Sequence, residues 1–314
     1  MRHKHVRRYI TFAPVHSLIK LSKRVILPGF EKLSFYIVSK FFFKGIQNGT
    51  LNTRASSLSF SFFLALFPTI IFLFTLIPYI PITHFKENLF LLMQDIMPKS
   101  AFEATKGTIQ DIIQKKRTGL LSVGFFSALY FSTNGFNAMV KAFNTTYHEI
   151  EPRGFWAQRL VSLFMLIVSV ILISSSIALY IGTDRLIHPL KHTHNIIYLI
   201  LHSIKWVILF GLCYSIVSFN YFIGPKKKKG WSFFSAGSMF ATVLIVIATV
   251  VFSYYVNKFG KYNKIYGSIG SLIVVMMLIY INSFILLLGF DLNASIHGAK
   301  RHLESFGKKR IKSL

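Results

Sequence analysis

The chain has 314 residues, of which 53% are hydrophobic and only 15% are charged. A soluble domain carries about a quarter charged residues, so this composition excludes an ordinary water-soluble globule. The 36 lysines and arginines greatly outnumber the 10 acids, which in a soluble protein would suggest nucleic-acid binding. Because the bases lie between apolar runs, we interpret them as charges that flank a membrane, and we expect no nucleic-acid partner.

Residues 1–54 are predicted to form a basic cytoplasmic segment ahead of the first membrane span. Within this segment, residues 33–43 are apolar apart from two serines and one lysine, and this stretch is too short to cross a bilayer. Tyr36, Lys40 and Lys44 recur every four positions, on one face of a helix. The pattern predicts a short interfacial helix that lies on the inner leaflet and contacts anionic lipid headgroups.

Six windows further along the chain are long and apolar enough to cross a hydrocarbon core of about 30 Å, which takes about 20 residues of helix. We therefore predict an all-α bundle of six transmembrane helices over residues 55–293, followed by a basic cytoplasmic tail over residues 294–314. The windows are residues 55–80, 120–143, 160–181, 196–223, 233–256 and 272–292. The second is the most polar, and Pro68 in the first predicts a kink that can serve as a hinge.

The distribution of basic residues predicts the orientation of this bundle. With six spans, 24 lysines and arginines fall on the side of the termini and 11 on the opposite side, while Lys205 lies within a span. Because cytoplasmic loops are enriched in basic residues, both termini are expected in the cytoplasm. The strongest single marker is the run Lys226–Lys229 between the fourth and fifth spans.

A stripe of polar residues marks the second window. Asn134, Asn137, Lys141 and Asn144 are spaced three, four and three apart, which places them on one helical face. Such a stripe is costly against hydrocarbon, so it must face other helices or a wet cavity. Two interpretations remain open: the side chains hydrogen-bond neighbouring helices, or they line a polar path that binds a ligand.

Asp291, at the cytoplasmic end of the sixth window, is the only acid in or beside the last five spans. An unpaired acid at this depth is costly, so a basic partner is expected. Arg54, Lys141 and Arg159 all fall near the same boundary, and we predict an ion pair with one of them. A structural anchor and a site for a coupling proton are the two roles considered.

The connection before the sixth window is rich in glycine and aromatic residues. Gly267 and Gly270 predict a tight turn, and Tyr262, Asn263 and Tyr266 are candidate ligand-contacting residues. A helix N-terminus beside lysines attracts anions, so a lipid phosphate or anionic substrate is one interpretation. The other is a capped turn with interfacial tyrosines.

Motifs for enzyme chemistry are missing. The chain contains no Walker loop, no G-x-S-x-G elbow and no H-E-x-x-H motif, and it has no paired carboxylates suited to acid–base or two-metal work. His188, His192 and His194 cluster in a short outer loop, but no second cluster completes a metal site. We therefore expect no catalytic residues, no metal and no cofactor.

Several of these segments resemble the YihY/BrkB family of bacterial inner-membrane proteins (virulence factor BrkB-like, once labelled ribonuclease BN). The resemblance covers roughly residues 51–299 and is most specific before and within the last span. Its residues are Tyr262-Asn263, Tyr266-Gly267-Ser268, Gly270, Leu288-Gly289, Asp291, Asn293-Ala294, Leu66-Phe67-Pro68, Asn144, Tyr147, Arg159 and Gly224-Pro225. The chain departs from the family in carrying aspartate where glutamate is commoner, and in lacking a tryptophan in the last span.

The resemblance implies a multi-pass protein of the bacterial inner membrane, in a family with members linked to serum resistance and, in one branch, to export of lipid-like molecules. The leading hypothesis is a transporter or flippase-like protein for an anionic or amphipathic envelope molecule. The alternative is a non-transporting scaffold that recruits partners through its basic tails. A membrane ribonuclease is the third hypothesis, which the scattered acids do not support. Membrane lipids are the expected partners, and the sequence is compatible with a homo-oligomer.

Overall fold

A computed structural model describes residues 22–23, 25, 29–31, 33–48, 50–79, 107, 111, 116–146, 153–187, 195–226, 232–259 and 268–312. Throughout these residues every regular element is a helix. The chain divides into two compact units, residues 59–135 and the remainder. The first expectation of the sequence, an all-α protein built largely from long apolar helices, is confirmed.

The smaller unit contains most of α3 (Leu51–Leu76), the short 3₁₀ helix η2 (Ile77–Tyr79) and the first two thirds of α6 (Thr118–Asn144). Two α6 glycines allow α3 and α6 to approach closely. A Cβ added at Gly124 would lie 3.3 Å from the backbone of Phe72, and one at Gly135 would lie 2.9 Å from the ring of Phe62. Small residues at such contacts are typical of membrane helices.

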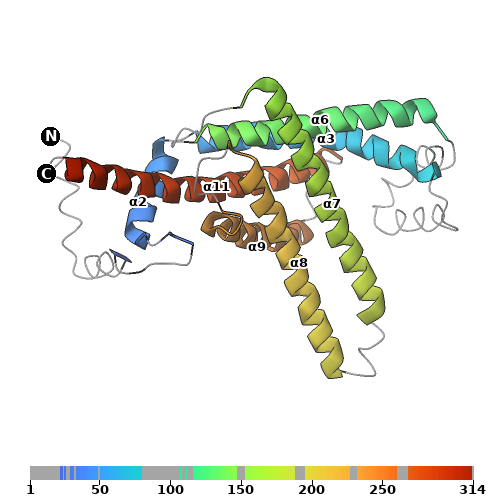
Figure 1. The fold of residues 1–314 in the computed structure, drawn as a ribbon. Coiled ribbons are helices and arrows are strands. Elements are labelled where there is room, and N and C mark those ends of the chain that lie inside the picture. The colour runs from blue at the N-terminus through green and yellow to red at the C-terminus, as the bar shows by residue number, and fades with distance from the viewer. Residues whose placement is uncertain are drawn as a thin grey trace. The chain divides into compact units, whose positions relative to one another are not determined.

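The larger unit contains α2 (Phe35–Asn48), α7 (Phe155–Ile187), α8 (Asn195–Ile223), α9 (Ala236–Phe259) and α11 (Ser268–Lys312), together with the start of α3 and the end of α6. In Figure 1, α7 and α8 form a long antiparallel pair, and α2 crosses α11. The helix α9 packs against both α8 and α11.

Five of these helices are long and apolar enough to cross a membrane: α3, α7, α8, α9 and the first two thirds of α11. Large apolar side chains along the helices are exposed, for example Val123 of α6, Val207 of α8 and Val250 of α9. Among the six predicted spans, the one formed by α6 does not reach the same apolar character. The polar stripe and several serines and threonines of this helix account for the difference.

The N-terminal helix differs in its bounds from the predicted one. The sequence indicated residues 33–43, whereas α2 covers Phe35–Asn48. Val38 of α2 is fully buried, in an apolar cluster with Phe30, Leu33 and the α11 residues Ile296 and Ala299. Lys40 and Lys44 are exposed, so one face of α2 packs on α11 and another carries charge.

The last helix is longer than predicted. The sequence placed the end of the sixth span at residue 292 and a tail after it, but α11 continues to Lys312. No proline interrupts residues 293–312, and packing against α2 stabilises the first turns of this extension. Part of the predicted tail is therefore a helical continuation of the last span.

Candidate functional site

A buried ion pair joins two helices of the larger unit. Two guanidinium nitrogens of Arg54, at the start of α3, donate to the two carboxylate oxygens of Asp291, in α11, at 2.6 and 3.2 Å. One of these nitrogens also donates to the backbone oxygen of Ala142 near the end of α6, at 3.0 Å. Both charged side chains are less than 10% exposed. Of the three bases considered for Asp291, the structure places Arg54 against it.

An aromatic cluster packs beside this pair. The rings of Phe143 and Phe290 stack with centroids 4.2 Å apart, and Tyr221 packs edge-on against both. The Tyr221 hydroxyl donates to the backbone oxygen of Leu286 in α11. The cluster packs the ends of α6 and α8 against α11, and its rings exclude water from the ion pair.

A second arginine holds the end of α8. Arg153, just before α7, donates to the backbone oxygens of Ile223, Gly224 and Pro225. These carbonyls lie at the C-terminal end of the helix, where acceptors lack partners within the helix and the dipole favours a cation. Burial lowers the pKa of the Arg153 guanidinium from its ordinary value, because loss of water disfavours the charged form.

The helices α9 and α11 cross in close contact where Gly237 of α9 meets Gly289 of α11. A Cβ added at Gly289 would lie 2.6 Å from the Cβ of Ala241 and 2.7 Å from the backbone oxygen of Gly237. One turn further along α11, the Asn293 side chain accepts a hydrogen bond from the Gly237 N–H at 2.7 Å and donates to the Ser235 hydroxyl at 2.8 Å. Asn293 therefore caps the N-terminus of α9 from a neighbouring helix.

The structure separates the members of the polar stripe on α6. Lys141 is exposed, whereas the other three residues are partly buried. The side-chain oxygens of Asn137 and Asn144 are buried without a hydrogen-bond partner in the described part of the protein. Asn134 does have a polar or ring contact. The stripe is thus a helical face whose amides are only partly satisfied by protein.

Several predicted site residues lie outside the described part of the chain. Tyr262, Asn263, Tyr266 and Gly267 are among them, as are the three clustered histidines and the four-lysine run beyond Lys226.

The remaining predicted residues are described. Gly270 is buried in the first turn of α11. Pro68 lies inside α3, and Arg159 lies in α7. The structure places Arg54 in the ion pair that was predicted for Asp291.

A cavity of about 300 Å³ opens beside Asn293. It is formed by three segments of the larger unit: the turn before α2, the chain between α8 and α9, and one face of α11. Its lining is mostly polar and consists of Gly29, Glu31, Ser232, Phe234, Ser235, Asn293, Ile296 and His297.

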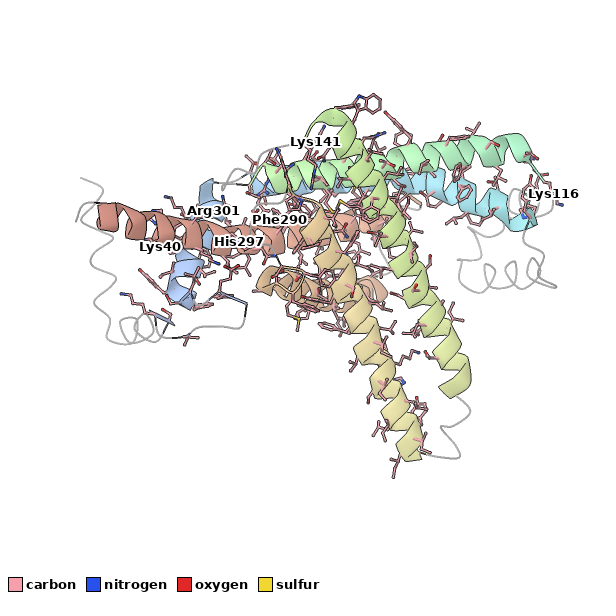
Figure 2. All side chains as sticks on the ribbon, in the orientation of Figure 1. Lys40, Lys116, Lys141, Phe290, His297 and Arg301 are labelled. Carbon is pink, nitrogen blue, oxygen red and sulfur yellow. The ribbon has the colours of Figure 1, made fainter. Side chains whose placement is uncertain are left out.

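Glu31 connects the turn before α2 to α11 at this cavity. One carboxylate oxygen lies 2.6 Å from the Lys300 ammonium, and the other lies 3.3 Å from His297 Nδ1. Glu31 has a φ of 49°, in a region that costs most side chains strain, and Gly29 has a φ of 83°. The buried ring of Phe30 between them anchors this turn in the apolar cluster on α11. Figure 2 marks His297 and Arg301 on the part of α11 that α2 crosses.

This cavity was not predictable from the sequence, because its walls come from three distant segments of the chain. One signal was present: Glu31 is the only acid among the first 54 residues, in a segment of 11 bases. A second was the spacing of Asn293, Ile296, His297 and Lys300, which places them on one face of a helix. Neither signal predicts that the two segments meet.

The chain matches the family model described as Virulence factor BrkB over residues 42–311. YfkH of Bacillus subtilis, named a ribonuclease-like protein, is 31% identical over 252 residues, which cover 79% of this chain and 91% of that relative. UPF0761 membrane proteins of Haemophilus influenzae and Vibrio campbellii are 22% and 23% identical, over 84% and 90% of this chain and 96% and 87% of their own lengths. No solved structure matches. The long apolar helices and the family match together identify the chain as a membrane protein of the Virulence factor BrkB family.

Proposed function

We propose that the protein crosses the bacterial inner membrane six times, with α6 as the most polar span and both termini in the cytoplasm. The contacts of the larger unit support this arrangement. Arg54 at the start of α3 donates hydrogen bonds to Ala142 near the end of α6 and to Asp291 of α11, and Arg153 before α7 holds the end of α8. These are the helix ends that the distribution of basic residues assigns to the cytoplasmic side.

We further propose that α2 lies at the inner membrane surface. Its exposed lysines suit contact with anionic headgroups, while its exposed Phe35 and Phe43 suit the boundary with the acyl chains. The opposite face is fixed to α11 by buried Val38. Membrane lipids are the partners this proposal requires, and assembly into a homo-oligomer is compatible with it.

The function we propose is transport, or movement between leaflets, of an anionic or amphipathic envelope molecule, without enzyme chemistry. The observation that carries the proposal is the stripe on α6. A helix among apolar spans carries buried amide oxygens without protein partners, within the described residues, at Asn137 and Asn144, and a charge at Lys141. Buried polar atoms without partners are rare in proteins, and in a membrane helix they indicate a solvated or ligand-lined face.

The test is a transport assay on the full-length protein in proteoliposomes. Vesicles carry one labelled lipid class at a time, and an impermeant quencher reports the fraction of label reaching the outer leaflet. We expect the wild-type protein to accelerate exchange of at least one class, and Asn137→Leu to reduce that rate tenfold or more. The matched control is Ser203→Leu, an exposed position on α8 whose hydroxyl donates to its own helix.

Movement of no lipid class by the wild-type protein would count against transport. An unchanged rate with Asn137→Leu would count against the stripe as its path. Circular dichroism and gel filtration in detergent would verify that both variants fold, so that a lost rate is not simply a lost structure.

The second candidate is the scaffold, and the length of α11 favours it. This helix extends well past Asp291 to Lys312 and carries a basic sequence at its end. A scaffold requires that deleting residues 1–30 and 301–314 abolishes function while Asn137→Leu is tolerated, and transport through the stripe requires the opposite. The name of YfkH leaves ribonuclease as a third hypothesis. That hypothesis requires metal-dependent cleavage of RNA by the pure protein.

A further inference from the structure

The cavity at Glu31 is separate from the α6 stripe, and the proposed transport does not use it. We propose that it binds the ammonium-bearing headgroup of a zwitterionic phospholipid in the cytoplasmic leaflet. This inference rests on the proposed orientation, which places Glu31 at the inner membrane surface, but not on transport. Binding and transport can therefore succeed or fail independently.

The lining of the cavity provides acceptors for a donor-rich group. The carboxylate of the lining belongs to Glu31, whose side chain is about one quarter exposed. Each carboxylate oxygen has two acceptor positions, and the contacts of Glu31 with His297 and Lys300 use one on each oxygen. The Ser232 hydroxyl adds a neutral acceptor. A primary ammonium, with three N–H donors, matches this set.

The surrounding charges select a zwitterion. Lys300 lies 2.6 Å from Glu31, so a ligand that carries only positive charge would be repelled by this ammonium. A ligand that carries only negative charge would be repelled by the carboxylate. An aminophosphate headgroup avoids both repulsions, because its ammonium lies at Glu31 and its phosphate lies on the side of Lys300. A trimethylated headgroup has no N–H donors and does not satisfy the carboxylate.

The size and position of the cavity suit a lipid headgroup. A volume of about 300 Å³ is at the lower limit for small-molecule sites, enough for a headgroup but not for acyl chains. Phe234 lies in its lining and is 77% exposed, and its ring stacks on Tyr214 of α8. An exposed aromatic ring beside a polar cavity is the arrangement expected at a membrane–water boundary, where the ring contacts the acyl chains.

The walls of the cavity are fixed rather than loose. Asn293, which is 3% exposed, is held by the Gly237 N–H and the Ser235 hydroxyl, and Phe30 anchors the turn that carries Glu31. The strained φ of Glu31 is maintained by these contacts and directs its carboxylate to His297 and Lys300. Little ordering cost is therefore left for binding.

The experiment measures lipid binding to the purified full-length protein in detergent by native mass spectrometry. Phosphatidylethanolamine, phosphatidylglycerol and phosphatidylcholine with identical acyl chains are titrated separately. We expect phosphatidylethanolamine to bind at least tenfold more tightly than the other two. Glu31→Gln should reduce its affinity to that of phosphatidylcholine. The matched control, Asp111→Asn, removes an acid that is paired with Arg117 in the smaller unit, and it should retain the preference.

Because Glu31→Gln also weakens the attachment of the turn to α11, a second variant keeps the proposal testable. Ser232→Phe fills the cavity from an exposed position without touching the Glu31 contacts. It should abolish the preference as well. Equal binding of the three lipids by the wild-type protein, or an intact preference in either variant, would overturn the proposal.

Discussion

At the scale of single residues, the buried Arg54–Asp291 pair joins the start of α3 to α11 in the larger unit. Burying two charges is costly, and their attraction offsets that cost only when the geometry is good and further hydrogen bonds are made. The pair is bidentate and Arg54 also donates to Ala142, while the Arg54 Nε–H is buried without a partner among the described residues. Removing one partner leaves the other charge buried and unpaired.

We therefore predict that Asp291→Asn lowers the free energy of unfolding by about 3–5 kcal/mol, the range for breaking a buried pair. Thermal unfolding in detergent, followed by tryptophan fluorescence, would measure the loss. The exchanged pair Arg54→Asp with Asp291→Arg should recover part of it, but not all, because the hydrogen bond to Ala142 is lost.

Lys141→Gln is the control for this prediction. Lys141 lies one position before Ala142 on α6 but is exposed, so its loss should change stability by less than about 1 kcal/mol. Equal destabilisation by Asp291→Asn and Lys141→Gln would show that net charge at this end of the protein, rather than the buried pair, determines stability.

At the scale of elements, the crossing of α9 and α11 depends on two backbones that approach without side chains between them. A Cβ at Gly289 would meet Ala241 and the Gly237 carbonyl, so a methyl group there has no room. Overpacking of this kind costs about 1–3 kcal/mol. We predict that Gly289→Ala is destabilising by this amount and also loosens the Asn293 contact with α9.

Gly211→Ala in α8 is the matched control, because a Cβ added at Gly211 has no atom within 4 Å. Alanine is the better helix former by up to about 1 kcal/mol, so this variant should be neutral or slightly stabilised. Comparing Gly289→Ala with Gly211→Ala by thermal unfolding separates the effect of crowding on stability from the effect of helix propensity. Equal melting temperatures for the two variants would mean that α9 and α11 do not cross at Gly289.

The helices themselves were largely predictable, because each apolar window needs a helix to satisfy its backbone. The window 196–223 matches α8 to within one residue at its start, whereas 272–292 ends 20 residues before α11 does. Apolarity marks where a helix can lie in lipid, but a helix continues until a stop signal or loss of packing ends it. No proline followed residue 292 to mark such a stop.

The sequence predicted only the part of the candidate site in which a single residue requires a partner of a known type. A lone acid near a bilayer needs a base, so Asp291 indicated its type of partner, although three bases fitted equally well from sequence. The cavity needed the meeting of Glu31 with His297 and Lys300, residues more than 260 positions apart. In the sequence, each of these polar residues can be interpreted as an ordinary surface residue. Only the fold shows that they lie close together.

At the scale of the whole molecule, the orientation in the membrane is the proposal on which both sites depend. The basic residues are split 24 to 11 between the two sides when six spans are assumed. With five spans, α6 would not cross, and the termini would then lie on opposite sides of the membrane. One experiment can therefore determine both the number of spans and the side of the membrane on which each loop lies.

Labelling of single cysteines in intact cells would decide both questions. Cys213 is the only native cysteine, so Cys213→Ser provides a cysteine-free background. Three cysteines are then introduced one at a time: Ser17→Cys in the N-terminal segment, Thr193→Cys between α7 and α8, and Lys228→Cys between α8 and α9. We expect an impermeant maleimide to label position 193 in intact cells, and positions 17 and 228 only after lysis.

The two ways in which this prediction can fail give different patterns. Labelling of positions 17 and 228 in intact cells would reverse the orientation of a six-span bundle. It would also place the Glu31 cavity in the outer leaflet, away from the lipids proposed to bind there. Labelling of position 228 without position 17 would instead mean that α6 does not cross, because one span fewer exchanges the sides of every later loop. The polar stripe would then lie outside the membrane, where its unpartnered amides need no transport path to explain them.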